Sequence, residues 1–579
     1  MRVALSLIAA LVAAVALAGP AQAATAGAAT TATTATSGTT TSTIKGPTTP
    51  LRGPSDPNAI SRPETLTGFP LDHRLNGKQA LEIAGRVKKI REELRKYPTA
   101  KPEVFLKGQT RWQVSWFTPG TGEARKEVAQ VIIDDATGVV TEAWTGPQVA
   151  WTMARGYPGA FGRKVNAPWV WIPLTILFVA PFLSWRRGLR LLQVDLTVLV
   201  AFGASVAFFN DANLDVSVPL VVPLLAYLLA RMAWIGLRRP REDEPPPGPL
   251  PLRVPVVWLA VGLVFLIGFR IGLNITSSNV IDVGYSGVIG ADRIADGEKL
   301  YGHFPNDNRH GDTYGPVAYL AYMPFEQLLP WSGRWDDLPA AHAAAITFDL
   351  LTILLLFLVG RRLRGTSMGI VLAYAWAAWP FSLYTLACNS NDALVAALGA
   401  LTLLVAGRPA LRGAAAALAG FSKLGSLGLV PLLATHGARA GDRLRTVAWF
   451  ALGFAVVTAI AWLPIVVHGE SLSTIWDRTL GFQATRDAPF SIWGLYDWPA
   501  PQRLWQGMAV AFGIAVAFIP RRRDLVGLAA LAAAVLIALQ LGLTYWFYLY
   551  LVWFFPFVAV ALFGRWQAPL PARSSARLR

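Results

Sequence analysis

Apolar stretches about as long as a lipid bilayer is thick recur along this chain, and they leave few folds open to it. A bilayer core needs roughly 20 apolar residues per helix, so these stretches predict about 11 spanning helices. A chain that is 54% hydrophobic and 15% charged also departs from the composition of soluble proteins. We therefore expect a mostly α-helical, polytopic membrane protein. The predicted spans lie near residues 168–185, 191–209, 216–236, 254–273, 339–360, 367–386, 393–407, 446–467, 505–520, 525–543 and 547–564.

The positions of the arginines predict how the chain is oriented. The net charge of +17 does not indicate nucleic-acid binding, because most basic residues lie in short loops between apolar stretches. Cytoplasmic loops carry an excess of Lys and Arg, and one orientation places every basic cluster on that side. These clusters are Arg186, Arg187 and Arg190; Arg238, Arg239 and Arg241; Arg361, Arg362 and Arg364; Arg408 and Arg412; Arg521 to Arg523; and Arg565.

The N-terminus predicts export across a bacterial plasma membrane. Residues 1–23 have Arg2, an apolar stretch and Ala-Gln-Ala before Ala24, which is typical of a secretory signal peptide. The same stretch is also compatible with an uncleaved anchor. Residues 24–60 are rich in Thr, Ala, Ser and Pro and predict a disordered tether.

Residues 61–165 predict a small α+β domain outside the cytoplasm. Residues 79–97 have helical periodicity, whereas 111–117 and 127–144 alternate as strands around an Asp-Ala-Thr-Gly turn at 135–138. A helix followed by a strand pair resembles the PepSY-like domains found outside bacterial membranes.

The remaining chain divides into three parts. Residues 166–253 hold three additional spans and a cytoplasmic linker, 254–565 hold the larger transmembrane core, and 566–579 form a basic cytoplasmic tail. Residues 413–436 have basic clusters on both sides, which predicts a re-entrant hairpin that enters and leaves on the cytoplasmic face. A complete span is the alternative for this segment.

Two long loops, 274–338 and 468–504, are predicted outside the cytoplasm. The first begins with Asp282 soon after an apolar stretch, and it is followed by Tyr301 and the sequence TYGPVAYLAYMPFE at 313–326. This order resembles the C-type glycosyltransferases, which take a sugar from a polyprenyl-phosphate donor. The closest resemblance is to the mannosyltransferases of glycosyltransferase family 87.

The resemblance extends over residues 254–565. SNDALVAALGALTLL at 390–404 is similar to a polar-capped span of the family, and LAGFSKLGSLGLVPLL at 418–433 is similar to its hairpin with Lys423. The resemblance implies an inverting sugar transfer on the outer face. The N-terminal domain and the three additional spans depart from the family pattern.

A carboxylate at the membrane surface could remove the proton of an acceptor hydroxyl as general base. Asp282 is our candidate because it lies at the end of a span, at interface depth. A helix cap or surface charge is the alternative. Asp292 and Asp296 are better explained by a solvated helix face.

The donor phosphate requires cations, which act most strongly at low dielectric. Lys423 is the first candidate, with a structural ion pair to an acid such as Asp349 as the alternative. Arg486 is either a donor contact or a surface residue, and Arg270 is either a donor contact or a side chain that reaches to the interface. The remaining candidates for donor binding are Tyr301 and Tyr314 of the resembling motifs.

The sequence thus predicts a membrane glycosyltransferase that moves a mannose-like sugar from a polyprenyl-phosphate donor to a cell-envelope glycan or glycolipid. Its partners are the bilayer, the lipid-linked sugar and the acceptor, with no nucleic acid. No metal and no cofactor is expected. The alternatives are a transporter or flippase of lipid-linked or polar solutes, and a sensor whose spans anchor the external domain.

Overall fold

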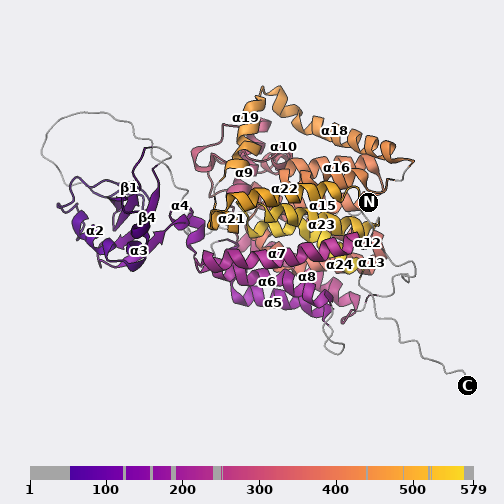
Figure 1. Ribbon diagram of the computed structural model, residues 1–579, viewed down its shortest axis with the longest axis horizontal. Coiled ribbons are helices and arrows are strands. Elements are labelled where there is room, and N and C mark those ends of the chain that lie inside the picture. Colours follow the sequence, from indigo (N-terminus) through magenta and orange to yellow (C-terminus); the bar gives the residue numbers. More distant parts are fainter. Residues whose placement is uncertain are drawn as a thin grey trace, which may run out of the picture. The chain divides into compact units, whose positions relative to one another are not determined.

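The computed structural model (Figure 1) describes residues 52–121, 125–156, 161–183, 191–238, 250, 252–438, 441–486, 488–519, 522 and 524–565. The chain forms two compact units. One, here called the sheet domain, comprises Gly27–Tyr157 with Asn210–Ala212, and the other, the membrane unit, is built mainly from Pro158–Phe209 and Asn213–Arg579. The predicted signal peptide, most of the tether, the tail and several of the arginines lie outside the described residues.

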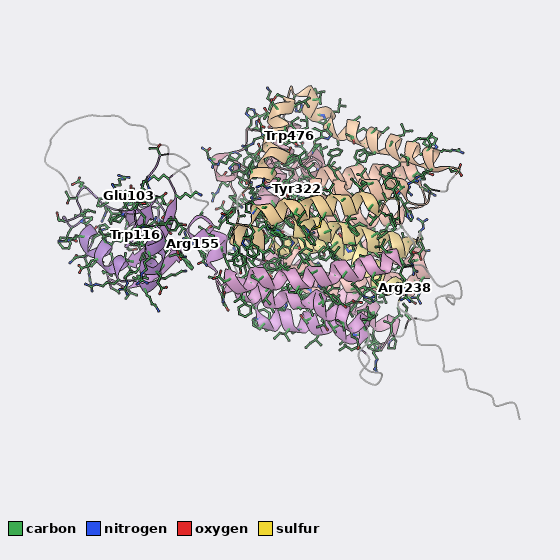
Figure 2. The ribbon with its side chains drawn as sticks, in the orientation of Figure 1. Glu103, Trp116, Arg155, Arg238, Tyr322 and Trp476 are labelled. Atoms are coloured by element: carbon green, nitrogen blue, oxygen red, sulfur yellow. The ribbon has the colours of Figure 1, made fainter. Side chains whose placement is uncertain are left out.

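The sheet domain contains a five-stranded antiparallel meander in the order β1-β2-β3-β4-β5. Helices α2 and α3 pack on one face of this sheet and close a core around Trp112, Val114 and Val131 (Figure 1). Trp116 belongs to the same core (Figure 2). The elements are β1 (Ile60–Ser61), α2 (Gly77–Gly85), α3 (Lys88–Lys96), β2 (Lys101–Lys107), β3 (Arg111–Phe117), β4 (Glu127–Asp134), β5 (Val140–Thr145) and α4 (Pro147–Ala150).

The acidic pair after β4 has a structural role in this domain. Asp134 accepts hydrogen bonds from the backbone and side chain of Thr137 and so closes the turn into β5. Asp135 is buried, and it accepts from the Nε1 of Trp112 at 2.8 Å and from two backbone amides that precede α2. Asp135 therefore satisfies a buried donor and ties the segment before α2 to the sheet.

Within the described residues, each predicted apolar span of the membrane unit is mostly helical. Its longer helices are α5 (Pro168–Val179), α6 (Leu191–Asn210), α7 (Leu214–Leu237), α8 (Val256–Thr276), α9 (Asp282–Ala295), α12 (Pro339–Arg364), α13 (Thr366–Ala378), α14 (Pro380–Ala387), α15 (Asp392–Leu404), α16 (Pro409–Ser422), α18 (Arg443–Val467), α22 (Pro499–Ala515), α23 (Leu525–Leu541) and α24 (Leu551–Gly564). Short elements lie in the loops: α10 (Pro316–Leu320), α11 (Met323–Glu326), α17 (Val430–Thr435), α19 (Leu472–Trp476), α20 (Phe482–Thr485) and α21 (Ile492–Leu495).

Several of these helices have the length and hydropathy of a membrane span. Among the described residues, α6, α7, α8, α12 and α18 meet that criterion singly. Helices α13 and α14 meet the criterion only when taken together, and they are bent by 57° where Trp379 adopts an extended conformation before Pro380. A residue before proline is disfavoured in the helical region, which explains the bend. The membrane character is confirmed, and the number of spans remains a prediction.

Residues 409–436 form a hairpin. Helix α16 ends at Ser422, Lys423 is extended (φ −141°, ψ 117°), and the 3-10 helix Leu424–Leu429 leads into α17. The guanidinium of Arg412, near the start of α16, donates to the carbonyl oxygens of Leu433 and His436 at 2.7 and 3.0 Å. The chain therefore turns back beside its own starting point. Such a break within a membrane is tolerated where protein surrounds it.

The three helices that precede the core pack against it within the membrane unit. Helix α7 lies along α23 (Figure 1), and α5 contacts α13. Ser205 of α6 and Ser217 of α7 both bond to the hydroxyl group of Tyr548, at 2.7 and 2.8 Å. The indole of Trp379 donates to the carbonyl oxygen of Leu199. The three additional helices therefore pack as an integral part of the membrane unit.

Candidate functional site

Asp282 is the first residue of α9, in the polar loop that connects α8 to α12. Its backbone oxygen accepts hydrogen bonds from the hydroxyl of Ser286 at 2.6 Å and from the amide of Asn308 at 3.0 Å. One carboxylate oxygen accepts from the backbone N–H of Val283 at 3.0 Å. The loop therefore holds this carboxylate in a defined position.

A face of glycines lets α9 approach its neighbours closely. A Cβ at Gly284 would lie 2.2 Å from the backbone oxygen of Asn389, and one at Gly290 would lie 2.2 Å from the ring of Tyr319. Next to this contact, the backbone N–H of Ile281 donates to the carbonyl oxygen of Cys388. The start of α9 is thereby packed against the turn that leads into α15, and this brings Asp282 toward Asp392.

The side chain of Asp282 is recessed but accessible. It retains solvent-exposed surface, yet protein atoms surround it densely enough that burial raises the pKa of its carboxyl group. The positive charges of Arg486 and Lys423 oppose this rise, and the carboxylate of Asp392 adds to it. A carboxylate that is reachable and partly desolvated is well suited to take up a proton.

Lys423 lies at the break of the hairpin, almost completely buried. Its ammonium nitrogen is 3.9 Å from the ring centre of Tyr314 and 3.7 Å from Oδ1 of Asp392. The same Oδ1 accepts a hydrogen bond of 2.7 Å from the indole of Trp553. Lys423 is therefore paired with a buried acid, as the alternative interpretation expected. The acid is Asp392, and the example given for it, Asp349, is wrong because Asp349 pairs with Arg270.

Arg486 belongs to the second polar loop, which connects α18 to α22. Its guanidinium carbon lies 3.6 Å from the ring centre of Tyr545 and 5.6 Å from that of Phe482. Arg486 acts electrostatically on Asp282, so it belongs to the same cluster rather than to an open surface. We call Asp282, Tyr314, Asp392, Lys423 and Arg486, with Tyr545 and Trp553, the charged cluster.

The second polar loop is tied to the first by an ion pair. Arg478 binds both oxygens of the buried Asp312, each at 2.7 Å, and Gln483 donates to the hydroxyl of Thr313 at 2.5 Å. Bidentate pairs of this kind fix geometry as well as adding binding energy. Arg478 lies in a short π-helical turn, Asp477–Gly481, a feature often found at functional sites.

Tyr301 contacts the backbone of Tyr314, a member of the charged cluster. It is fully buried, its hydroxyl donates to the carbonyl oxygen of Tyr314 at 2.9 Å, and its backbone N–H donates to Glu470. Tyr314 in turn presents its ring to the ammonium of Lys423. Of the two tyrosines, Tyr314 lies in the cluster, and Tyr301 fixes the segment that carries Tyr314.

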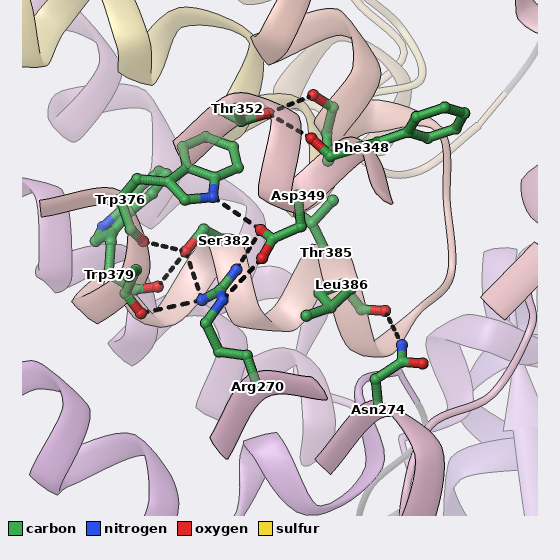
Figure 3. Close-up of polar contacts among 12 residues, drawn as sticks. Arg270, Asn274, Phe348, Asp349, Thr352, Trp376, Trp379, Ser382, Thr385 and Leu386 are labelled. Carbon is green, nitrogen blue, oxygen red and sulfur yellow. Dashed lines mark hydrogen bonds and ion pairs between the residues drawn. The ribbon is translucent and has the colours of Figure 1, made fainter. Parts of the chain in front are cut away.

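Arg270 occupies a different place (Figure 3). Its guanidinium forms a buried ion pair with both oxygens of Asp349, and it also donates to Ser382 and to the carbonyl oxygen of Ala377, each at 3.1 Å. The indole of Trp376 donates to the same aspartate at 2.8 Å. Arg270 thus joins α8 to α12, α13 and α14.

The other acids in α9 and directly after it differ from Asp282. Asp296 is exposed, as expected for a solvated face. Asp292 is half-buried, and burial together with the nearby Glu326 raises the pKa of its carboxyl group. The sequence interpretation therefore fits Asp296 better than Asp292.

The sequence interpretation missed Asp392, Tyr545 and Trp553 as members of the cluster. Asp392 follows Ser390 and Asn391 at the start of a predicted span, so polar residues at the edge of an apolar stretch were the available signal. The aromatic residues gave no such signal, because Tyr and Trp are common where spans meet the interface.

A search against models of protein families matches Glycosyltransferase family 87 over residues 313–549. The match includes Tyr314, Asp392, Lys423 and Arg486, and it begins after Asp282. Searches of curated proteins and of solved structures find no match.

The protein is therefore a glycosyltransferase. Its apolar helices make it a multi-pass membrane enzyme. The PepSY-like character of the sheet domain stays a prediction, because the family match does not include that domain.

Proposed function

We propose that the enzyme transfers a mannose-like sugar from a polyprenyl-phosphate donor to a hydroxyl group of a cell-envelope glycan or glycolipid, with Asp282 as general base. The reaction takes place at the outer face of a bacterial plasma membrane, where the sheet domain and both polar loops lie. One observation carries the proposal: an accessible carboxylate shares a cluster with two cations.

The bond changes follow from this arrangement. The acceptor oxygen attacks the anomeric carbon from the side opposite the phosphate, and its proton passes to the carboxylate of Asp282. The bond from the anomeric carbon to the phosphate oxygen breaks, and polyprenyl phosphate leaves with the electron pair. The configuration at the anomeric carbon is inverted.

Charge develops on the departing phosphate, and Lys423 and Arg486 offset it. The ammonium group of Lys423 is 3.7 Å from Asp392, which is longer than a hydrogen bond. Its N–H groups can therefore donate hydrogen bonds to a phosphate oxygen. In a water-poor setting such cations stabilise a transition state more strongly than they would in water. A metal ion is not part of the proposal.

The test is Asp282→Asn, which keeps the size of the side chain and removes the base. With purified protein and a polyprenyl-phosphate mannose donor, the transfer rate should fall about 10²–10⁴-fold, while donor binding persists. The control is Asp296→Asn, directly after the same helix, which should transfer at the rate of the unaltered protein because Asp296 is exposed. Near-normal transfer by Asp282→Asn would show that the base is elsewhere.

A further inference from the structure

One oxygen of the charged cluster has no partner. Asp392 is 1% exposed, and its Oδ1 is engaged by Trp553 at 2.7 Å and by Lys423 at 3.7 Å. Within the described part of the chain, its Oδ2 has no hydrogen-bond partner. The neighbouring Asn391 is equally buried, and neither atom of its amide has a partner among the described residues. Unsatisfied polar atoms are therefore concentrated at the first turn of α15.

Such an oxygen is costly to bury. A carboxylate in the interior needs hydrogen bonds to most of its lone pairs, and a buried acceptor without a donor bears the full desolvation penalty. Asp349, the comparable buried carboxylate of α12, has both oxygens bound by Arg270 and a further bond from Trp376. A counter-ion with no other task would resemble Asp349. Asp392 does not.

We propose that Oδ2 of Asp392 accepts a hydrogen bond from the donor sugar, namely from the hydroxyl group on the carbon next to the anomeric carbon. This inference rests on the proposed function, in which Lys423 holds the donor phosphate. That hydroxyl is the ring hydroxyl nearest to the phosphate. Asp392 is the acid bound to the same lysine, so a sugar whose phosphate is held at Lys423 would bring this hydroxyl close to Asp392.

The contact would also assist the reaction. As the bond to phosphate stretches, the anomeric carbon gains positive charge and the adjacent hydroxyl becomes a better donor. Hydrogen bonds to this hydroxyl strengthen in the transition states of glycoside hydrolysis for the same reason. Asp392 is thus a residue that binds and selects the donor sugar, distinct from the base Asp282.

The experiment combines a protein variant with donors that each lack one hydroxyl group, and it compares the values of kcat/KM. Purified full-length protein and Asp392→Asn are each assayed for kcat/KM with polyprenyl-phosphate mannose and with its 2-deoxy, 3-deoxy and 4-deoxy analogues. The ratio between the two proteins cancels the intrinsic reactivity of each analogue. A hydrogen bond to a charged acceptor corresponds to about 10- to 100-fold in rate. The variant should lose this factor with the parent donor and lose little with the 2-deoxy donor.

Trp553→Phe is the matched control, since it removes the bond to Oδ1 and leaves Oδ2 unchanged. Its rate loss should be the same with all four donors. Should Asp392→Asn fail to fold, the double variant Asp392→Asn, Lys423→Met removes both buried charges and is crossed with the same donors.

Equal losses with the 2-deoxy and parent donors would overturn the inference and make Asp392 a counter-ion alone. If Asp392→Asn instead loses little rate with the 3-deoxy or the 4-deoxy donor, Asp392 binds that hydroxyl group and the assignment to the 2-hydroxyl group is wrong. If the unaltered protein transfers no sugar from the lipid donor, the proposed function itself fails, and this inference fails with it.

Discussion

The carboxyl group of Asp282 is the titratable group on which the proposed reaction depends. Burial raises its pKa above the ordinary value of 3.8, despite the opposing charges of Arg486 and Lys423. The ionised form, which acts as base, is therefore present only above this raised pKa. We expect kcat/KM to fall as the pH is lowered, with the midpoint of the decline above pH 3.8.

The measurement is a pH profile of sugar transfer with donor well below saturation. Asp282→Asn should lack the acidic limb in its residual activity. If the decline of activity at low pH persists unchanged in Asp282→Asn, that decline is due to the titration of another group.

At single residues, the sequence was informative where a charge stood out in an apolar setting. Lys423 and Arg486 were recognised, and they lie in the cluster. Their partners were not, because an ion pair joins positions far apart in the chain. The alternative interpretation named Asp349 as an acid that could pair with Lys423. In the structure, Asp349 pairs with Arg270, and Lys423 pairs with Asp392.

At the scale of elements, α9 depends on its glycines for its position. A Cβ at Gly284 would meet the backbone oxygen of Asn389, an atom that no rotamer change can move away. Gly284→Ala should therefore destabilise the protein by about 1–3 kcal/mol, as overpacking commonly does. It should also slow sugar transfer, because Asp282 lies two positions away.

The measurement is the apparent melting temperature of purified protein, taken together with transfer activity. Gly272→Ala in α8 is the control, since a Cβ there meets no atom within 4 Å. Alanine favours a helix over glycine, so this variant should be as stable as the original or more so. Equal behaviour of the two variants would mean that α9 is less closely packed than described.

Periodicity predicted the elements of the membrane unit well, because a long apolar stretch has few alternatives to a helix in lipid. The hairpin at 413–436 was also anticipated, from basic residues on both sides. The sheet domain was harder. One helix was expected over residues 79–97, but the chain ends α2 at Gly85 and begins α3 at Lys88. Strand β2 was missed altogether, because its lysines and proline obscure the alternation.

For the whole molecule, the arginine pattern predicts that the sheet domain and the first polar loop share one side of the membrane. Single cysteines at Thr141 and Asn306, both exposed, should react with a membrane-impermeant thiol reagent in intact cells. Cys388 is buried and should stay unreactive, so no native thiol needs removal. A cysteine at the exposed Asp442, between α17 and α18, should react only after lysis. Protection at Thr141 or Asn306 before lysis would reverse the orientation.

The ion pair between α8 and α12 has a consequence for how the protein is made. Arg270 and Asp349 are 79 residues apart in the chain, so α8 leaves the ribosome well before its partner helix exists. A guanidinium in hydrocarbon is costly until it is paired, and in the interval it has to reach toward the interface or stay beside the insertion machinery. We therefore expect α8 to pack into the core only after α12 has been made.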